Sequence, residues 1–273
     1  MIPLAIIWDA NPEIFELFGI SLRWYSLFFA LAFLGGYYMV KFYSKGAKIS
    51  DKVYDYWLVF TVAGAVIGAR LGHCLFYEFD YYSHHPLEIL KIWKGGMASH
   101  GGAIGLLISL WIFSKRYTLN FTWVLDKMAA TFAIDAAYLR IGNLMNSEIF
   151  GYPTDLPWGF VFINAKPAEA VPRHPTQLYE AISYLIVFLA IHFIDKKNNY
   201  NSPKGLLLSI LLIGVFGTRF LIEFLKERQV NFENYMTLDM GQWLSIPFLI
   251  AGILLFIYVK TKKNNNIKTE QYV

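Results

Sequence analysis

Four charged side chains fall inside or at the ends of long apolar runs: Arg70, Arg140, Arg219 and Glu223. A charge at the centre of a bilayer costs about 2.5 to 3.5 kcal/mol on insertion scales, so each of these positions needs an explanation. Guanidinium groups match phosphate oxygens in pairs, which predicts that the arginines face a cavity and hold an anionic ligand. The alternative is that Arg140 and Arg219 reach the membrane surface or pair with Asp126, Asp135 or Glu223.

A second polar cluster follows Arg140 along the chain. It comprises Arg140, Asn143, Asn146 and Glu148, with glycines at Gly142 and Gly151. If the chain stays helical past Arg140, then Asn143 shares its face three residues later. The two glycines would allow the backbone to turn. A cation, two amides and a carboxylate within a dozen residues indicate a binding site rather than an ordinary polar loop.

A third cluster ends a later apolar run, where Arg219, Glu223 and Lys226 are spaced four and three residues apart. In a helix this spacing places all three on one stripe. An exposed ion pair at this spacing contributes only about 0.2 to 0.5 kcal/mol, which is too little to justify charges in a membrane segment. The spacing therefore predicts a ligand or a deeper network.

The glycine-rich segment 95–105 contains His100 at the start of an apolar run. Small residues allow a close approach of either a ligand or another helix, and a helix N-terminus presents unpaired N–H groups to an anion. His100 is a candidate proton acceptor there. The alternative is that the glycines serve helix packing and that His100 only caps the helix.

The composition places these clusters in a membrane protein. Of 273 residues, 56% are hydrophobic and only 16% are charged, which is more apolar side chain than a soluble domain of this length can bury. The basic residues lie in short runs between apolar segments, which favours lipid headgroups over nucleic acid as partners. A spanning helix needs about 20 apolar residues. Seven spans are predicted at residues 20–40, 53–76, 100–113, 123–140, 177–194, 205–224 and 243–259.

Basic residues alternate between the connections. One set carries Lys41, Lys45, Lys48, Lys52, Lys115, Arg116, Lys196, Lys197, Lys204, Lys260, Lys262, Lys263 and Lys268. The other set carries Lys91, Lys94, Lys166 and Arg173 among Glu78, Asp80, Glu88, Asp155 and Glu169. The positive-inside rule then puts the N-terminus outside and the C-terminus in the cytoplasm. We expect an all-α polytopic membrane bundle, with one catalytic domain over residues 1–261 and a disordered cytoplasmic tail over 262–273.

The ordered motifs resemble the prolipoprotein diacylglyceryl transferases. The segment Arg140–Gly151 is similar to that family's signature, Arg-x-Gly-Asn-x-x-Asn-x-Glu-x-x-Gly. The other similar blocks are Arg23–Tyr25, His100–Gly102, His174–Glu180, Arg219–Glu223 and Met240–Ser245. Leu139, Leu144 and Lys226 depart from the usual Gly, Phe and Arg. A lysine keeps the charge at position 226 but loses the bidentate fork.

The resemblance implies transfer of the diacylglyceryl group of phosphatidylglycerol to the lipobox cysteine of a prolipoprotein, with release of glycerol phosphate. It also implies a bacterial cytoplasmic (inner) membrane location, an active site open to the periplasmic side, and contacts with membrane lipids and prolipoprotein signal peptides. No nucleic-acid partner, metal or cofactor is expected, because the sequence has no HExxH and no Cys/His ligand spacing.

The expected roles follow from the chemistry of this reaction. Arg140 and Arg219 would hold the phosphate, Glu223 would orient Arg219, and Tyr25 would donate a hydrogen bond near the entrance. Asn143, Asn146 and Glu148 would shape the headgroup site, with His100 as a candidate base for the thiol. Two other classes stay open: a transporter of a small anion, which would favour paired broken spans, and a lipid-binding scaffold without catalysis.

Overall fold

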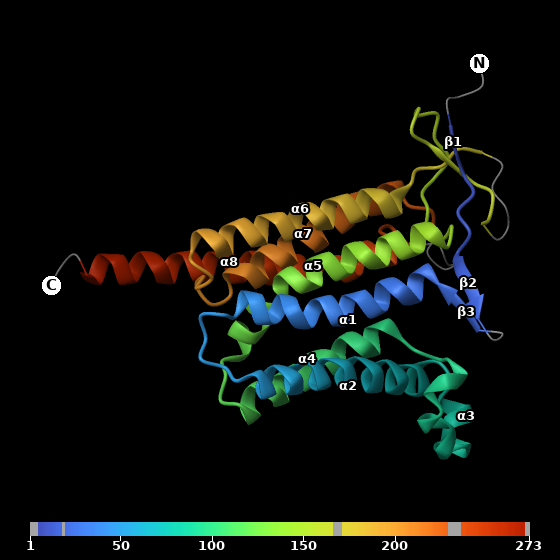
Figure 1. Cartoon of the computed structure of the whole chain (residues 1–273). Helices are drawn as coiled ribbons and strands as arrows, with labels where there is room; N and C mark the ends of the chain where they lie inside the picture. The colour runs from blue at the N-terminus through green and yellow to red at the C-terminus, as the bar shows by residue number, and fades with distance from the viewer. Residues whose placement is uncertain (1–4, 18–19, 166–170, 229–235, 271–273) are drawn as a thin grey trace. The chain divides into compact units, whose positions relative to one another are not determined.

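A computed structural model of the chain describes residues 5–17, 20–165, 171–228 and 236–270 (Figure 1). Its helices are α1 (Trp24–Tyr43), α2 (Asp51–Phe76), α3 (Phe79–His84), α4 (Ser99–Arg116), α5 (Phe121–Met145), α6 (Thr176–Lys197), α7 (Leu206–Ile222) and α8 (Met240–Glu270), with 3₁₀ turns η1 (Pro86–Leu90), η2 (Ile92–Lys94) and η3 (Glu223–Leu225). Its strands are β1 (Ile6–Trp8), β2 (Glu13–Leu17), β3 (Ile20–Arg23) and β4 (Phe160–Phe162). The topology and tail predictions also include Lys166, Glu169 and residues 271–273, which lie outside the described residues.

Each predicted span falls on a long helix. Within the described ranges, five helices are long and apolar enough to cross a membrane: α1, α2, α6, α7 extended through η3, and α8. The expectation of a mostly helical membrane protein is therefore confirmed. The other two predicted spans are the helices α4 and α5, and α5 is made more polar by Asp126, Lys127, Asp135 and Arg140. The described part of the tail is helical as far as Glu270. The disorder expected for residues 262–273 is therefore not confirmed and stays a prediction.

The predicted start of the first span is wrong. Residues Ile20–Arg23 form β3, which pairs antiparallel with β2, and the helix begins only at Trp24. The backbone N–H of Trp24 donates to the carbonyl of Pro12 at 3.1 Å, and Arg23 pairs with Glu13 at 3.3 Å. These contacts hold the chain extended before α1. Hydropathy alone does not separate a short apolar strand from a helical turn.

The chain forms two compact units, and residues Lys45–Leu125 make up one of them. In this unit α2 and α4 run side by side (Figure 1). Gly64, Gly68 and Gly72 of α2 meet Gly101 and Gly105 of α4 so closely that a Cβ on Gly72 would lie 2.7 Å from the Cα of Gly101. Helix packing is therefore the role of Gly101 and Gly105 in the glycine-rich segment.

Arg70 also has a structural role in this unit. Its side chain donates to the backbone carbonyls of Ile89 at 2.8 Å, Gly95 at 2.5 Å and Glu88 at 2.6 Å. The guanidinium lies over the ring of Tyr82, 5.0 Å from its centroid. Because Arg70 is only 3% exposed and each of its three guanidinium nitrogens donates to a backbone carbonyl, its observed role is to hold the segment between α2 and α4.

The second unit comprises residues 1–44 and 126–273, including α1, most of α5, and α6 to α8. An apolar core joins α1, α5, α6 and α7 through Tyr43, Ala129, Ala133, Ile191, Leu207 and Leu211. At one end Asp126 accepts from the backbone N–H of Leu208 at 2.8 Å and so caps the start of α7. A buried ion pair between Lys127 and Asp195, 3.3 Å long, ties α5 to α6 beside it.

At the other end of this unit the connections form a small backbone network. β1 pairs with β4 in parallel, and Phe160 of β4 bridges to Arg173. Arg173 bridges in turn to Pro153, and Gly151 bridges to Lys226. This ladder fixes the chain after α5 against the start of α6 and the end of α7, which is where the polar clusters of the sequence lie.

Candidate active site

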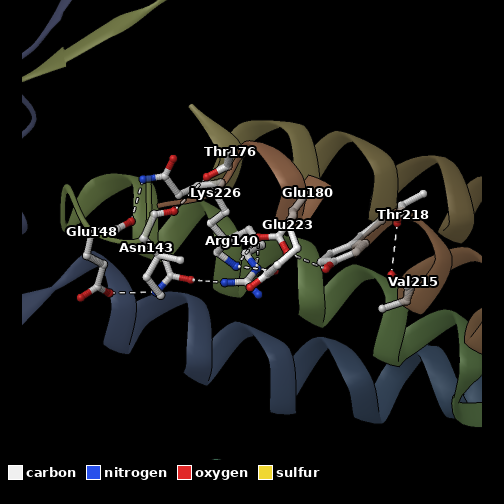
Figure 2. A network of polar contacts seen from close by, with 12 residues as sticks. Arg140, Asn143, Glu148, Thr176, Glu180, Val215, Thr218, Glu223 and Lys226 are labelled. Atoms are coloured by element: carbon white, nitrogen blue, oxygen red, sulfur yellow. Dashed lines mark hydrogen bonds and ion pairs between the residues drawn. The ribbon is translucent and has the colours of Figure 1, made fainter. Parts of the chain in front are cut away.

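Arg140 lies in the last turns of α5, which stays helical through Met145. Its Nε lies 2.8 Å from Oε2 of Glu180, and its Nη1 donates to Oδ1 of Asn143 at 3.2 Å. Figure 2 shows Arg140 between these two partners. The expected sharing of a face by Arg140 and Asn143 is confirmed, because the helix continues past both.

Glu180 of α6 is a partner that the motif analysis does not single out. Its side chain is fully buried and receives a 3.2 Å hydrogen bond from the hydroxyl of Tyr184, while Nζ of Lys226 lies 3.7 Å away. In the described part of the chain, Arg140 forms its ion pair with Glu180 and not with Asp126 or Asp135. The sequence does carry a signal for Glu180, because a carboxylate within the predicted span 177–194 needs an explanation for the same reason as Glu223 does.

The third cluster comes together differently from the prediction. α7 ends at Ile222, Glu223–Leu225 form a 3₁₀ turn, and Lys226 is extended, so the three charges do not share one helical stripe. Lys226 nevertheless reaches Oε2 of Glu223 at 3.3 Å. Burial lowers the pKa of Lys226, which is 4% exposed, while the carboxylate of Glu180 acts in the opposite direction.

Arg219 stands one turn before Glu223 on α7. Within the described ranges it makes no ion pair, and Glu223 pairs with Lys226 instead. Its charge still helps to lower the pKa of Lys226, so it lies within electrostatic range of the network. Arg219 therefore adds a cation whose charge no described carboxylate contacts.

Asn143, Asn146 and Glu148 meet as the sequence predicts. Both amides donate to Oε1 of Glu148, at 2.8 Å from Asn143 and 3.2 Å from Asn146. The turn that carries Glu148 is held from α6, because Gln177 donates to the carbonyl of Glu148 at 2.6 Å and Thr176 to that of Ile149 at 3.0 Å. The polar cluster thus rests on two helices.

The predicted turning role of Gly142 and Gly151 is wrong, since positive φ angles occur at Ser147 (52°) and Ile149 (62°) instead. Gly142 lies inside α5, where a Cβ would approach the ring of Tyr25 to 2.9 Å. A Cβ on Gly151 would lie 2.8 Å from Cβ of His174. Both glycines allow close approach, and Gly142 brings Tyr25 of α1 beside the cluster.

His100 belongs to the unit Lys45–Leu125, where it is exposed in the first turn of α4. The expectation that His100 is the base for the acceptor thiol rests on the sequence alone. A different histidine, His174, lies in the unit that contains Arg140. Its Nδ1 is 3.2 Å from the hydroxyl of Tyr179, which accepts from Nε1 of Trp158 at 2.9 Å. Burial lowers the pKa of His174, which keeps its ring neutral near pH 7.

This arrangement suits an anion more than a metal. Arg140 and Lys226 are held by buried carboxylates, and the amide of Asn143 lies beside Arg140 (Figure 2). Arg219 adds a further cation on α7. Cations preorganised in a poorly hydrated site stabilise charge that develops on an oxygen. The geometry can therefore bind a phosphate and stabilise it as a leaving group.

Comparison with known proteins agrees with this chemistry. A family model described as prolipoprotein diacylglyceryl transferase matches residues 12–258. A phosphatidylglycerol–prolipoprotein diacylglyceryl transferase of Chloroherpeton thalassium is 45% identical over 266 residues, 97% of each chain. Proteins with the same name from Bacteroides fragilis and Tolumonas auensis are 45% and 40% identical and cover 95% and 94% of this chain, and 97% and 99% of their own.

The residues matched by the family model include every motif named above, and the five apolar helices agree with a multi-pass membrane protein. Because the family model and these relatives cover nearly the whole length, the chain belongs to the prolipoprotein diacylglyceryl transferase family.

Proposed function

We propose that this protein transfers the diacylglyceryl group of phosphatidylglycerol to the thiol of a lipobox cysteine, the first step of bacterial lipoprotein maturation. The relatives bear the name of this reaction. The observation that carries the proposal is the buried network around Arg140, where Glu180 and Asn143 hold two edges of the guanidinium. Donors of the same group stay available to a phosphate in this arrangement.

The step joins sulfur to carbon. The thiolate attacks the glyceryl carbon that carries the phosphate, a C–S bond forms, and the C–O bond breaks. The phosphate leaves with the electron pair as glycerol phosphate, and the thiol proton passes to a base or to solvent. A free cysteine thiol has a pKa near 8.5, so a base increases the thiolate fraction of the acceptor, and His100 is our candidate for it.

Each side chain has a role in this step. Arg140 and Arg219 bind the phosphate and stabilise the charge that it gains. Asn143, Asn146 and Glu148 line the headgroup site and hydrogen-bond its glycerol hydroxyls. Tyr25 donates at the entrance. Glu223 orients Arg219, which precedes it by four residues, and it holds Lys226 through their ion pair.

The orientation in the membrane follows from the charges of the second unit. The Arg140 network lies at the end of α5 and at the start of α6, while Lys41, Lys196 and Lys197 lie at the other ends of α1 and α6. In Figure 1 β1 and the end of α8 likewise lie at opposite ends of this unit. By the positive-inside rule these positions support an outer N-terminus, a cytoplasmic C-terminus and an active site open to the periplasmic side of the inner membrane. The proposed bundle has seven spans, the five apolar helices together with α4 and α5.

Within this account residues 1–261 form the catalytic domain, and 262–273 are a cytoplasmic tail. The substrates are phosphatidylglycerol and prolipoprotein signal peptides that carry a lipobox cysteine, and surrounding membrane lipids contact the helices.

Purified protein, phosphatidylglycerol vesicles and a lipobox peptide test the proposal. Mass spectrometry should show the peptide gaining one diacylglyceryl group on its cysteine, and replacement of that cysteine by serine should abolish the gain. An unmodified peptide, with uptake of an anion by vesicles or with lipid binding alone, would favour the transporter or the scaffold instead.

A further inference from the structure

The buried charges around Arg140 form a neutral set. Arg140 contacts Glu180 at 2.8 Å, and Lys226 lies 3.3 Å from Glu223 and 3.7 Å from Glu180. These four side chains are between 0% and 13% exposed. Two cations and two carboxylates share a poorly hydrated volume, so their charges sum to zero and each stabilises the ionised form of the others.

Arg219 adds one uncompensated positive charge to this set. It stands in the last turn of α7, four residues or about one helical turn before Glu223, and makes no ion pair with any described residue. Three cations and two carboxylates give a net charge of +1. Glu148 is exposed and already accepts from two amides, so water screens its charge from this count.

Substrate and product differ in charge. The phosphodiester of phosphatidylglycerol carries one negative charge, whereas a phosphomonoester has a second pKa near 6 and carries about −1.5 to −2 at pH 7. A monoanion brings the site to neutrality. A dianion leaves an unpaired negative charge in a partly dry volume, which is unfavourable.

We propose that Glu180 sets the charge of this site so that it accepts the monoanionic phosphodiester and releases the dianionic phosphomonoester that the reaction produces. This inference rests on the proposed function. During the step the breaking C–O bond leaves its electron pair on the phosphate, which passes from one negative charge to two. The site therefore neutralises the substrate before the step, its cations attract the charge that develops on the leaving oxygen, and the finished dianion exceeds the net charge of the site by one.

Glu180 suits this role because of its position. It is fully buried, contacts both Arg140 and Lys226, and takes a hydrogen bond from Tyr184, so its carboxylate acts on the ligand through the cations. It is a positioning and specificity-determining residue, and Arg140 is the group that touches the phosphate. Replacing it by glutamine keeps its shape and changes the net charge of the set from +1 to +2.

Two soluble forms of the headgroup test the proposal as inhibitors of transfer by the purified full-length protein at about pH 7.5. Glycerophosphoglycerol is a phosphodiester and glycerol 1-phosphate is a phosphomonoester. With the wild-type protein the diester should have the lower inhibition constant. In Glu180→Gln the ratio of the two constants should shift by about tenfold or more toward the monoester, because one unit of charge is added near the phosphate.

Asp195→Asn is the matched control. Asp195 is also a fully buried carboxylate of α6 paired with a lysine, but it lies at the opposite end of the helix. This change should leave the inhibitor ratio of the wild type unaltered, and so should Tyr184→Phe, which removes a hydroxyl and no charge. Glu223→Gln, in the turn η3 that follows α7, adds the same increment of charge and should shift the ratio as Glu180→Gln does.

The outcomes separate the two proposals. A wild-type protein that binds the monoester at least as tightly as the diester overturns the charge match, and so does an unchanged ratio in Glu180→Gln. If Glu180→Gln does not fold, an unchanged ratio in Glu223→Gln is equally decisive. A wild-type protein that modifies no lipobox peptide contradicts the proposed function itself.

Discussion

Gly241, at the start of α8, leaves the space that the carboxylate of Glu223 fills. A Cβ at this position would lie 2.6 Å from Oε2 of Glu223 and still closer to the other carboxylate atoms. Since Glu223 in turn contacts Lys226, the absence of a side chain on Gly241 helps to place a cation of the network. The motif that contains Gly241 thus has a steric reason for its glycine.

Gly241→Ala should therefore lower transfer without unfolding the protein. The carboxylate that it meets is the end of a flexible side chain and can move, so the fold survives while Lys226 loses the nearer of its two carboxylate partners. We expect at least about a tenfold loss of kcat/KM, since buried charge pairs are sensitive to small displacements. Gly217→Ala on α7 is the control, because its Cβ would meet only Leu249 at an ordinary 3.7 Å. Equal activity of both variants would contradict the role of Glu223.

At this scale the sequence predicts contacts within one helix better than contacts between helices. The Arg140–Asn143 contact follows from a spacing of three residues in α5. The Arg140–Glu180 contact joins α5 to α6, and no periodicity states which faces of two helices meet. The prediction for Gly142 is wrong for the same reason, because its neighbour Tyr25 belongs to α1.

Among the elements, α2 and α4 depend on small residues for their pairing. A Cβ on Gly68 would lie 2.7 Å from the Cα of Gly105, and a Cβ on Gly105 would lie 2.6 Å from the Cα of Gly68. The opposing atoms are backbone, which cannot rotate away. Close backbone approach is also how helices associate where no hydrophobic effect drives them together.

Gly68→Val should destabilise this pair of helices by about 1 to 3 kcal/mol or more, since backbone must shift to admit the side chain. Thermal unfolding monitored by circular dichroism in detergent measures the change. Gly35→Ala on α1 serves as control, because nothing lies within 4 Å of its Cβ. An unchanged melting temperature in Gly68→Val would show that α2 and α4 do not pack through these glycines.

The long helices are predictable because each one repeats a strong apolar signal over many residues. The short strands are not, and β3 falls within the predicted first span because Ile20 and Leu22 continue its hydropathy. Pairing with β2 decides that these residues are extended, and hydropathy carries no signal of that pairing. The expected helical stripe through Lys226 is also wrong, since Lys226 follows the turn η3 in an extended conformation and bridges to Gly151.

At the scale of the molecule, the two ends of the second unit carry different groups of charged residues. The Arg140 network and the strands lie at one end, and the basic residues Lys41, Lys196 and Lys197 lie at the other ends of their helices. The Lys127–Asp195 pair and the capping carboxylate of Asp126 belong to the latter end. The positive-inside rule predicts that the end with Lys41, Lys196 and Lys197 faces the cytoplasm.

Cysteine labelling checks that orientation. Cys74 is the single cysteine of the chain and is buried, so Cys74→Ser gives a background for introduced thiols. A membrane-impermeant maleimide applied to spheroplasts should label Asp155→Cys and leave Lys197→Cys unlabelled until the membrane is permeabilised. Labelling of Lys197→Cys alone in sealed spheroplasts would reverse the proposed topology.

The central claim is that Arg140 holds the phosphate of the lipid through a guanidinium fixed on one edge by Glu180. The most direct test is kcat/KM for diacylglyceryl transfer in Arg140→Lys, with Arg116→Lys at the exposed end of α4 as control. A lysine keeps the charge but not the fork, so we predict a fall of at least about 100-fold in a protein that inserts and melts as the wild type does. Transfer by Arg140→Lys at the rate of the Arg116→Lys control would contradict the account.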